Sequence, residues 1–246
     1  MTLVPVPERG RTFTASRLTR LGDVSPGGRL RFDAIARYLQ DVANDDAVDA
    51  ALEGAMAWVV RRTVIEVDAF PVFREPLTLT TFASGSGRSW AERRTSVHGE
   101  QGSHLEAAAL WVYVDPDTGR PRSLPEEFVT VYGEATGGRK VRARLEHPDP
   151  TPGLDREPWP LRFADFDALG HVNNAVYLAV VEEHLARRRD LRAPLRLEVE
   201  FRNAVESDHE VAVMAQAESD GGLSLWVVGE DDAVHASARL RQLTSV

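Results

Sequence analysis

The chain has 246 residues, 43% of them apolar and 27% charged, a composition typical of a folded globular protein with one large domain or two small ones. Its formal net charge of −9 argues against nucleic acid as a partner, because phosphate binding needs a basic surface. The absence of cysteine excludes disulfides, thiolate metal sites and a cysteine nucleophile, and no apolar run approaches the roughly 18–20 residues of a membrane span.

The N-terminal residues MTLVPVPERGR lack the basic start and apolar stretch of a signal peptide, so we expect a cytoplasmic protein with no membrane partner. Basic side chains, all but one of them arginine, gather in several places. These clusters are either solvated surfaces or a docking surface for a phosphate-bearing or acidic carrier. They lie at Arg61 and Arg62, Arg93 and Arg94, residues 139–144, and residues 187–189.

The first half of the chain predicts one helix followed by four strands. Residues 30–52 carry apolar side chains at the spacing of one helix face, and Thr12–Leu18 before them alternates as a strand does. The four runs with strand character that follow are Trp58–Asp68, Pro76–Ala83, Ser89–His98 and Leu105–Val114.

The second half repeats this order. It predicts a strand at Trp159–Ala164, a helix at Asn174–Arg189, and then four more strands. Residues 133–158 between the halves are rich in glycine, proline and charge, as linkers are. We therefore expect an N-terminal unit at 1–132, a linker at 133–158 and a C-terminal unit at 159–246. The later strands are expected at Leu195–Phe201, Glu210–Ala217, Leu223–Val228 and Val234–Leu240.

A single helix followed by consecutive strands favours an α+β fold in which an antiparallel sheet packs on the helix, and argues against a parallel, doubly wound sheet. Two such units in one chain would pack as a pseudo-dimer. We predict a tandem, or double, hotdog: two antiparallel sheets, each wrapped around a long central helix.

The segment RFADFDALGHVNNAVYLAVVEE, residues 162–183, lies where a strand is expected to lead into the second helix. The first N–H groups of a helix have no internal partners, and the helix dipole there favours developing negative charge. Asn173 or Asn174 is a plausible N-cap, and Gly170 gives the turn its freedom. Such a junction suits a reaction at a carbonyl group.

Two side chains of this segment are candidates for the chemistry. Asp167 can act as a nucleophile or as a general base on water, and His171 can orient it or carry protons. A thioester is an accessible target because its thiolate leaves readily, without a metal or an organic cofactor. The alternative is that Asp165, Asp167 and Asn173 serve in turns and caps, and that His171 is structural.

The run DFDALGHVNN, with Tyr177 and Glu183 after it, resembles the signature of hotdog thioesterases of the 4-hydroxybenzoyl-CoA thioesterase-like superfamily. In that signature an Asp-x-x-Gly-[His]-Val-Asn-Asn stretch opens the central helix. The aspartate that carries catalysis falls on Asp167. The resemblance adds Asn173 and Glu183 to Asp167 and His171 as candidate site residues.

The first half is similar to the N-terminal half of acyl-ACP thioesterases from plants and bacteria. The resemblance rests on RYLQDVAND, WVVRRTVIEVDAFPVFREPLTLTTFASG and LWVYVDPDTGRPRSLPEEF, and spans roughly residues 12–243. It implies hydrolysis of fatty acyl-ACP, with an acyl carrier protein or coenzyme A thioester as the partner and no cofactor. The first half would shape the acyl pocket, in a monomer or a homodimer.

The chain departs from the plant enzymes at three positions. Their motif reads Asp-x-Asn-x-His, and its asparagine falls on Leu169; their downstream Glu-Cys pair falls on Ala204 and Val205. Glu183 and Glu206 are candidate replacements for the lost acid, although a buried helix glutamate also commonly makes a structural hydrogen bond.

The junction of the first half, residues 21–32, has neither the histidine nor the paired asparagines. Its Asp23 is either a remnant of Asp167 or an ordinary turn residue.

Other chemistries lack their motifs. SGSGR at 84–88 does not open a helix as a phosphate loop does, no Gly-x-Ser-x-Gly elbow is present, and the histidines lack metal-ligand spacing. The alternatives that stay open are a coenzyme A thioesterase for short or aromatic acyl groups and a non-catalytic acyl- or carrier-binding protein. A hotdog hydratase would need a Gly-Asp-x-Asn-Pro-x-His motif, which is missing.

Overall fold

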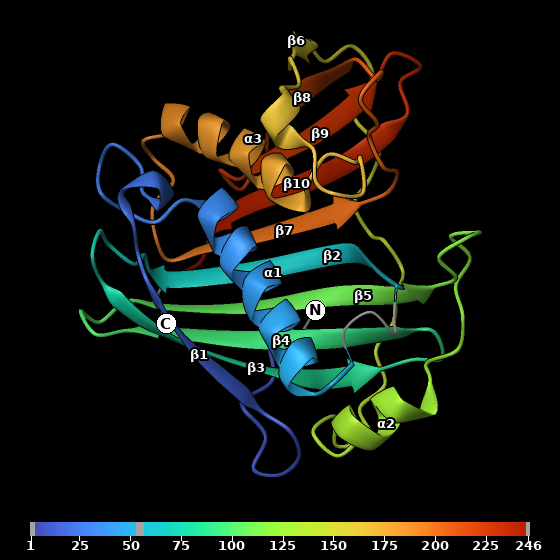
Figure 1. Ribbon diagram of the computed structural model, residues 1–246. Coiled ribbons are helices and arrows are strands. Elements are labelled where there is room, and N and C mark those ends of the chain that lie inside the picture. The colour runs from blue at the N-terminus through green and yellow to red at the C-terminus, as the bar shows by residue number, and fades with distance from the viewer. Residues whose placement is uncertain (1–2, 53–56, 245–246) are drawn as a thin grey trace.

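The computed structural model describes residues 3–52 and 57–244. It is an α+β structure with one large antiparallel sheet (Figure 1). The two longer helices lie across the same face of this sheet and contact each other. None of the helices in these ranges has the length and apolar character needed to cross a bilayer.

The first half follows the predicted order of strand, helix and four strands. Its elements are β1 (Phe13–Leu18), α1 (Phe32–Asp49), β2 (Ala57–Ala69), β3 (Pro76–Ser86), β4 (Trp90–Gly99) and β5 (His104–Val114). A short helix that we did not predict, α2 (Glu126–Tyr132), follows and packs Phe128 and Tyr132 against Leu52.

The second half has the predicted helix and four later strands. They are α3 (Asn174–Arg187), β7 (Leu195–Phe201), β8 (Val211–Ala217), β9 (Leu223–Gly229) and β10 (Val234–Gln242).

The predicted strand at Trp159–Ala164 is wrong. The only strand there is β6 (Glu157–Pro158), and Phe163–Asp165 form a 3₁₀ turn. Pro158 and Pro160 have no N–H group to donate to a sheet, so strand pairing stops after Trp159 donates to Val211 O at 2.9 Å.

The two halves do not form two sheets, as we expected, but one sheet of ten strands. The strand order is β1-β3-β4-β5-β2-β7-β10-β9-β8-β6. β2 and β7 pair antiparallel, with Thr63 opposite Val199, so the edge that each half would otherwise leave open is closed by the other. Alternation within a strand shows which face is buried, but not which strand lies beside it, so the sequence did not reveal this joint.

The sheet order reads the same from either end when β1, β3, β4, β5 and β2 are matched with β6, β8, β9, β10 and β7. Each half therefore builds the same arrangement, and an approximate twofold relates them about the β2–β7 seam. One apolar core runs through both halves, and in it Ile35 and Val42 of α1 join Leu178 and Val181 of α3.

A buried ion pair crosses the seam. Arg62 on β2 lies directly opposite Glu200 on β7. The Nη2 atom of Arg62 is 2.8 Å from Oε1 of Glu200, and the exposed fractions of the two residues are 3% and 0%. Glu200 also accepts the backbone N–H groups of Glu146 at 2.7 Å and His147 at 3.0 Å. Arg62 donates to the carbonyl oxygen of Arg144 at 2.5 Å. The segment between the halves is thus fastened across the seam.

The surroundings of Glu200 favour its ionised form. Burial raises the pKa of the carboxyl group, but the two backbone hydrogen bonds and the nearby His147 and Arg62 outweigh burial and leave the pKa lowered. Glu200 therefore stabilises the fold above the ordinary glutamate pKa of about 4.3, and this contribution is lost as the pH falls through the lower, folded pKa.

We expect Glu200→Gln to lower the free energy of unfolding at neutral pH by about 3 kcal/mol, because it leaves the Arg62 charge buried without its counter-charge. Urea unfolding measures this loss. The gap between variant and wild type should narrow as the pH falls below about 4, through the folded pKa of Glu200.

The control is Asp190→Asn, which breaks the exposed pair between Arg188 and Asp190 and should leave the unfolding midpoint almost unchanged. Equal effects of the two substitutions would show that the seam pair is not a major support of the fold.

Candidate active site

The loop before α3 is a tight turn closed by backbone hydrogen bonds. The N–H of Asp167 donates to the carbonyl oxygen of His171 at 2.9 Å, and the N–H of Gly170 donates to that of Asp167 at 3.0 Å. Phe166 and Val172 form an antiparallel bridge just outside this turn. Gly170 has φ +77°, a conformation that side chains with Cβ rarely adopt, so the loop needs its glycine.

The turn brings Asp167 and His171 together through the backbone. The Oδ1 atom of Asp167 accepts the N–H of Leu169 at 2.9 Å, which is the turn role that we set against catalysis. Its Oδ2 atom and the imidazole of His171 have no hydrogen-bond partner within the described residues, and both side chains are half-buried. The carboxylate therefore keeps one oxygen for another molecule.

Asn173 is the N-cap of α3. Its Oδ1 accepts the N–H of Ala175 at 2.9 Å, and its own N–H donates to the carbonyl oxygen of Asp165. Asn174 is the first helical residue, and its N–H has no hydrogen-bond partner in the described part of the chain. A free donor at the positive end of a helix dipole can stabilise an oxyanion.

Glu183 is exposed on the solvent side of α3, whereas its neighbour Glu182 is buried. Glu182 binds Arg29 at 2.6 Å and accepts the N–H of Phe32, the first residue of α1, at 3.2 Å. Sequence analysis missed Glu182 because its partners lie about 150 positions earlier in the chain.

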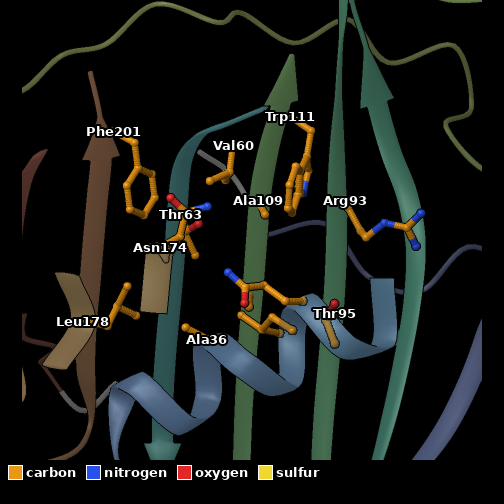
Figure 2. A pocket seen from close by; sticks show the side chains of 13 residues that line it. Ala36, Val60, Thr63, Arg93, Thr95, Ala109, Trp111, Asn174, Leu178 and Phe201 are labelled. Carbon is orange, nitrogen blue, oxygen red and sulfur yellow. The ribbon is translucent and has the colours of Figure 1, made fainter. Parts of the chain in front are cut away.

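Two adjoining cavities lie between α1 and the sheet. The narrow one, lined by Asn174 and Leu178 of α3 (Figure 2), has a volume of about 30 Å³, and the wide one, in the first half, has a volume of about 230 Å³. Gln40, Arg93 and Trp111 line both. The wide one is otherwise lined mostly by apolar and aromatic side chains: Ala43, Ala47, Leu52, Trp58, Ala83, Ala91, Phe128 and Tyr132.

Asp167 and His171 do not line this cavity; they lie on the loop that leads directly into Asn174, which does. Figure 2 shows Asn174 and Leu178 facing the strands of the first half, across from Thr63 and Trp111. Among the described lining residues Glu92 is the only carboxylate and none is histidine, so these residues offer no set of metal ligands.

The first half repeats the loop before α3. The N–H of Ser25 donates to the carbonyl oxygen of Arg29, as that of Asp167 does to His171, and the Arg31 N–H bonds to the carbonyl oxygen of Asp23. These bonds match Ser25 with Asp167 and Arg29 with His171. They match Asp23 with Asp165, not with Asp167, and so favour the second of our two alternatives, an ordinary turn residue.

At the repeated loop, side chains occupy the space at the start of α1. Arg29 and Glu182 form a salt bridge at the start of α1, and the guanidinium lies 4.7 Å from the ring centre of Phe70. The same loop backbone is thus followed by a salt bridge at the start of α1 and by a cavity at the start of α3.

The positions at which the chain departs from the plant enzymes hold no acid. Leu169 and Ala204 are exposed, and Val205 is buried with its carbonyl oxygen accepting the N–H of Val172. Glu206 is exposed beside His209, with which its backbone N–H bonds.

Comparison with known proteins covers both halves. The family models for the acyl-ACP thioesterase N-terminal domain and C-terminal domain match residues 10–132 and 153–241. An uncharacterized protein of Mycobacterium tuberculosis is 30% identical over 99% of this chain and 97% of its own length.

Two further likenesses are more distant. A chloroplastic palmitoyl-acyl carrier protein thioesterase of Arabidopsis thaliana is 23% identical over 72% of this chain and 48% of its own length. The structure of a 12:0-ACP thioesterase from Umbellularia californica superimposes with a TM-score of 0.79 at 19% identity, covering 95% of this chain and 97% of that one. At that identity the structural likeness establishes the fold.

Proposed function

The chain belongs to the acyl-ACP thioesterase family and is a thiolester hydrolase, and on this premise we propose that it hydrolyses fatty acyl-ACP to free fatty acid and carrier protein. The observation that carries the proposal is the narrow cavity lined by Asn174, which shares Gln40, Arg93 and Trp111 with an apolar chamber in the first half. An acyl chain in the chamber would bring its thioester carbonyl to the start of α3.

We assign the parts of the tandem hotdog as follows. Residues 1–132 enclose the acyl chain, 133–158 link the halves, and 159–246 supply the reacting groups. The arrangement is supported by the repeated order of helix and strands, although the two halves share one sheet.

In the proposed reaction the Asn174 N–H stabilises the negative charge that forms on the carbonyl oxygen. Asp167 uses its free oxygen either to take a proton from the attacking water or to attack the carbonyl carbon itself. In either case the carbon–sulfur bond breaks, and His171 can pass a proton to the departing thiolate. If Asp167 attacked, the product is an acyl–aspartyl anhydride, which water then cleaves to the fatty acid and the free carboxylate. Asn173 acts indirectly, by capping α3 and so holding the Asn174 N–H in place.

Gln40 adds a polar group that sequence analysis did not single out. Phe32 and Asn174 are equivalent positions, because each is the first residue of its helix after the N-cap. Gln40 lies eight residues after Phe32, and Glu182 lies eight residues after Asn174, so these two positions are also equivalent. Glu182 bonds to the first N–H of α1, so Gln40 occupies the corresponding place toward the first N–H of α3.

Gln40 and Asn174 line the same narrow part of the cavity, and the Gln40 amide has no hydrogen-bond partner among the described side chains. We infer that this amide holds the attacking water or the thioester opposite Asn174. It would replace the acid missing at Ala204, while Glu183, exposed on the solvent side, lies outside the cavity.

On saturated substrates of varied chain length, we expect a higher kcat/KM for acyl-ACP than for acyl-CoA, with no metal added. The preference should decline as salt is raised, because docking of an acidic carrier on arginine clusters is electrostatic. Equal or better kcat/KM on acyl-CoA, without salt dependence for acyl-ACP, would instead favour the broader acyl-CoA thioesterase.

Asp167→Asn should lower kcat by about 10²–10⁴-fold. The asparagine oxygen can still accept the Leu169 N–H, so the turn is kept while the basic oxygen is lost. The matched control is Ser25→Ala, at the equivalent position of the first-half loop, which should leave kcat unchanged. A folded Asp167→Asn protein with most of its activity would place the reacting group elsewhere.

Gln40→Leu should lower kcat by about 10²-fold with little change in KM, because an apolar side chain fills the space but holds no water. Gln40→Glu should restore part of the activity with a new ionisation in the pH–rate profile. Asp41→Asn, an exposed neighbour on α1, serves as control. A change in KM alone would show that Gln40 lines the acyl pocket but does not act in the chemical step.

A further inference from the structure

A cluster of metal-ligating side chains lies on the face of the sheet opposite the cavity. His98 on β4 is directly opposite His104 on β5, and their rings stack with centres 4.6 Å apart. Glu106, two residues after His104, points to the same face. Ala107 lines the cavity, and because strand residues alternate between faces, the cluster lies on the other side of β5.

The potential ligand atoms of His98, His104 and Glu106 all lie within 4.8 Å of one another. The His104 Nε2 atom is 3.1 Å from Glu106 Oε1, and the hydroxyl of Ser96 bonds to that oxygen at 2.6 Å and to His98 Nε2 at 3.0 Å. Three strong ligand groups therefore converge on one small volume.

A second carboxylate orients the cluster from outside. Asp68 at the end of β2 accepts the Nδ1–H of His104 at 2.7 Å, which leaves Nε2, beside Glu106, as the ring nitrogen that would bind a metal after losing its proton. Histidines that bind metals commonly have such a carboxylate on the far ring nitrogen, where it fixes the tautomer and makes the ligand more basic.

We propose that His98, His104 and Glu106 bind a divalent transition-metal ion, with Zn²⁺ as the best match. Two imidazoles and one carboxylate suit zinc, whereas Mg²⁺ and Ca²⁺ prefer oxygen ligands alone. Tetrahedral bonds of about 2.0–2.1 Å place ligand atoms roughly 3.3–3.5 Å apart. Closing the present cluster to that size requires His98, which is exposed, to turn out of its stack with His104.

The ion would join the end of the β4–β5 hairpin and, through Asp68, the end of β2. It would stabilise this corner of the sheet and leave a coordination position open to solvent. Because it lies across the sheet from the cavity, it is separate from thioester hydrolysis and does not depend on the function proposed above.

The test is titration calorimetry of the full chain, freed of any polyhistidine tag, with Zn²⁺ and with Mg²⁺ near neutral pH. We expect one Zn²⁺ per chain with a micromolar or lower Kd, no heat from Mg²⁺, and a Tm that rises with Zn²⁺. His98→Ala and Glu106→Gln should each weaken Zn²⁺ binding at least tenfold, and Asp68→Asn about 10–100-fold.

The control is His209→Ala, which removes one ring of the other close histidine pair, His209 and His235, whose ring centres are 5.6 Å apart. It should leave Zn²⁺ affinity unchanged. Circular dichroism and thioesterase activity, the latter unaffected by a chelator, verify that each variant is folded. The proposal is overturned if wild type does not bind Zn²⁺, or if His98→Ala and Glu106→Gln bind it as wild type does.

Discussion

The Glu200 carboxylate lies in the middle of a ten-stranded sheet and is shielded from solvent. A buried charge of this kind is costly unless neighbouring groups compensate it, and they do so here. The counter-charge, Arg62, comes from the other half of the chain, and the backbone donors of Glu146 and His147 come from the segment between the halves. One carboxylate thereby fixes the register of β2 on β7 and the path of the connecting segment. The cavity depends on this joint, because its walls come from both halves.

The approximate twofold about the β2–β7 seam gives both helices the same backbone surroundings, while the side chains at the two helix starts differ. Both helices begin after the same hydrogen-bonded loop, and each faces a side chain eight residues into the other. At the start of α1 this backbone holds Arg29 and Glu182, which neutralise each other and fill the space. At the start of α3 it holds His171 and Gln40, which do not pair, and a cavity opens. A few side chains, not a different backbone, distinguish the two ends.

The two faces of β4 and β5 also serve different purposes. Alternation sends Arg93, Thr95 and Ala107 toward α1 and the cavity, and sends His98 and Glu106 to the opposite face. Side chains on one face can therefore change without altering the cavity on the other.

Local features were determined by the sequence alone, because periodicity, glycine and capping chemistry act within a few residues. They are the two long helices, nine of the strands, the turn at Gly170 and an asparagine cap at 173 or 174, which the structure places at Asn173. The misplaced strand at Trp159–Ala164 shows the limit even there, since two prolines outweighed its apolar pattern. Four features were decided by the tertiary structure: the single sheet, the Arg62–Glu200 pair, the placement of Gln40 and Asn174 in one cavity, and the convergence of His98 with His104 and Glu106. Each joins strands or helices whose adjacency no local pattern encodes, because only packing of the whole chain selects which edge and which helix face meet.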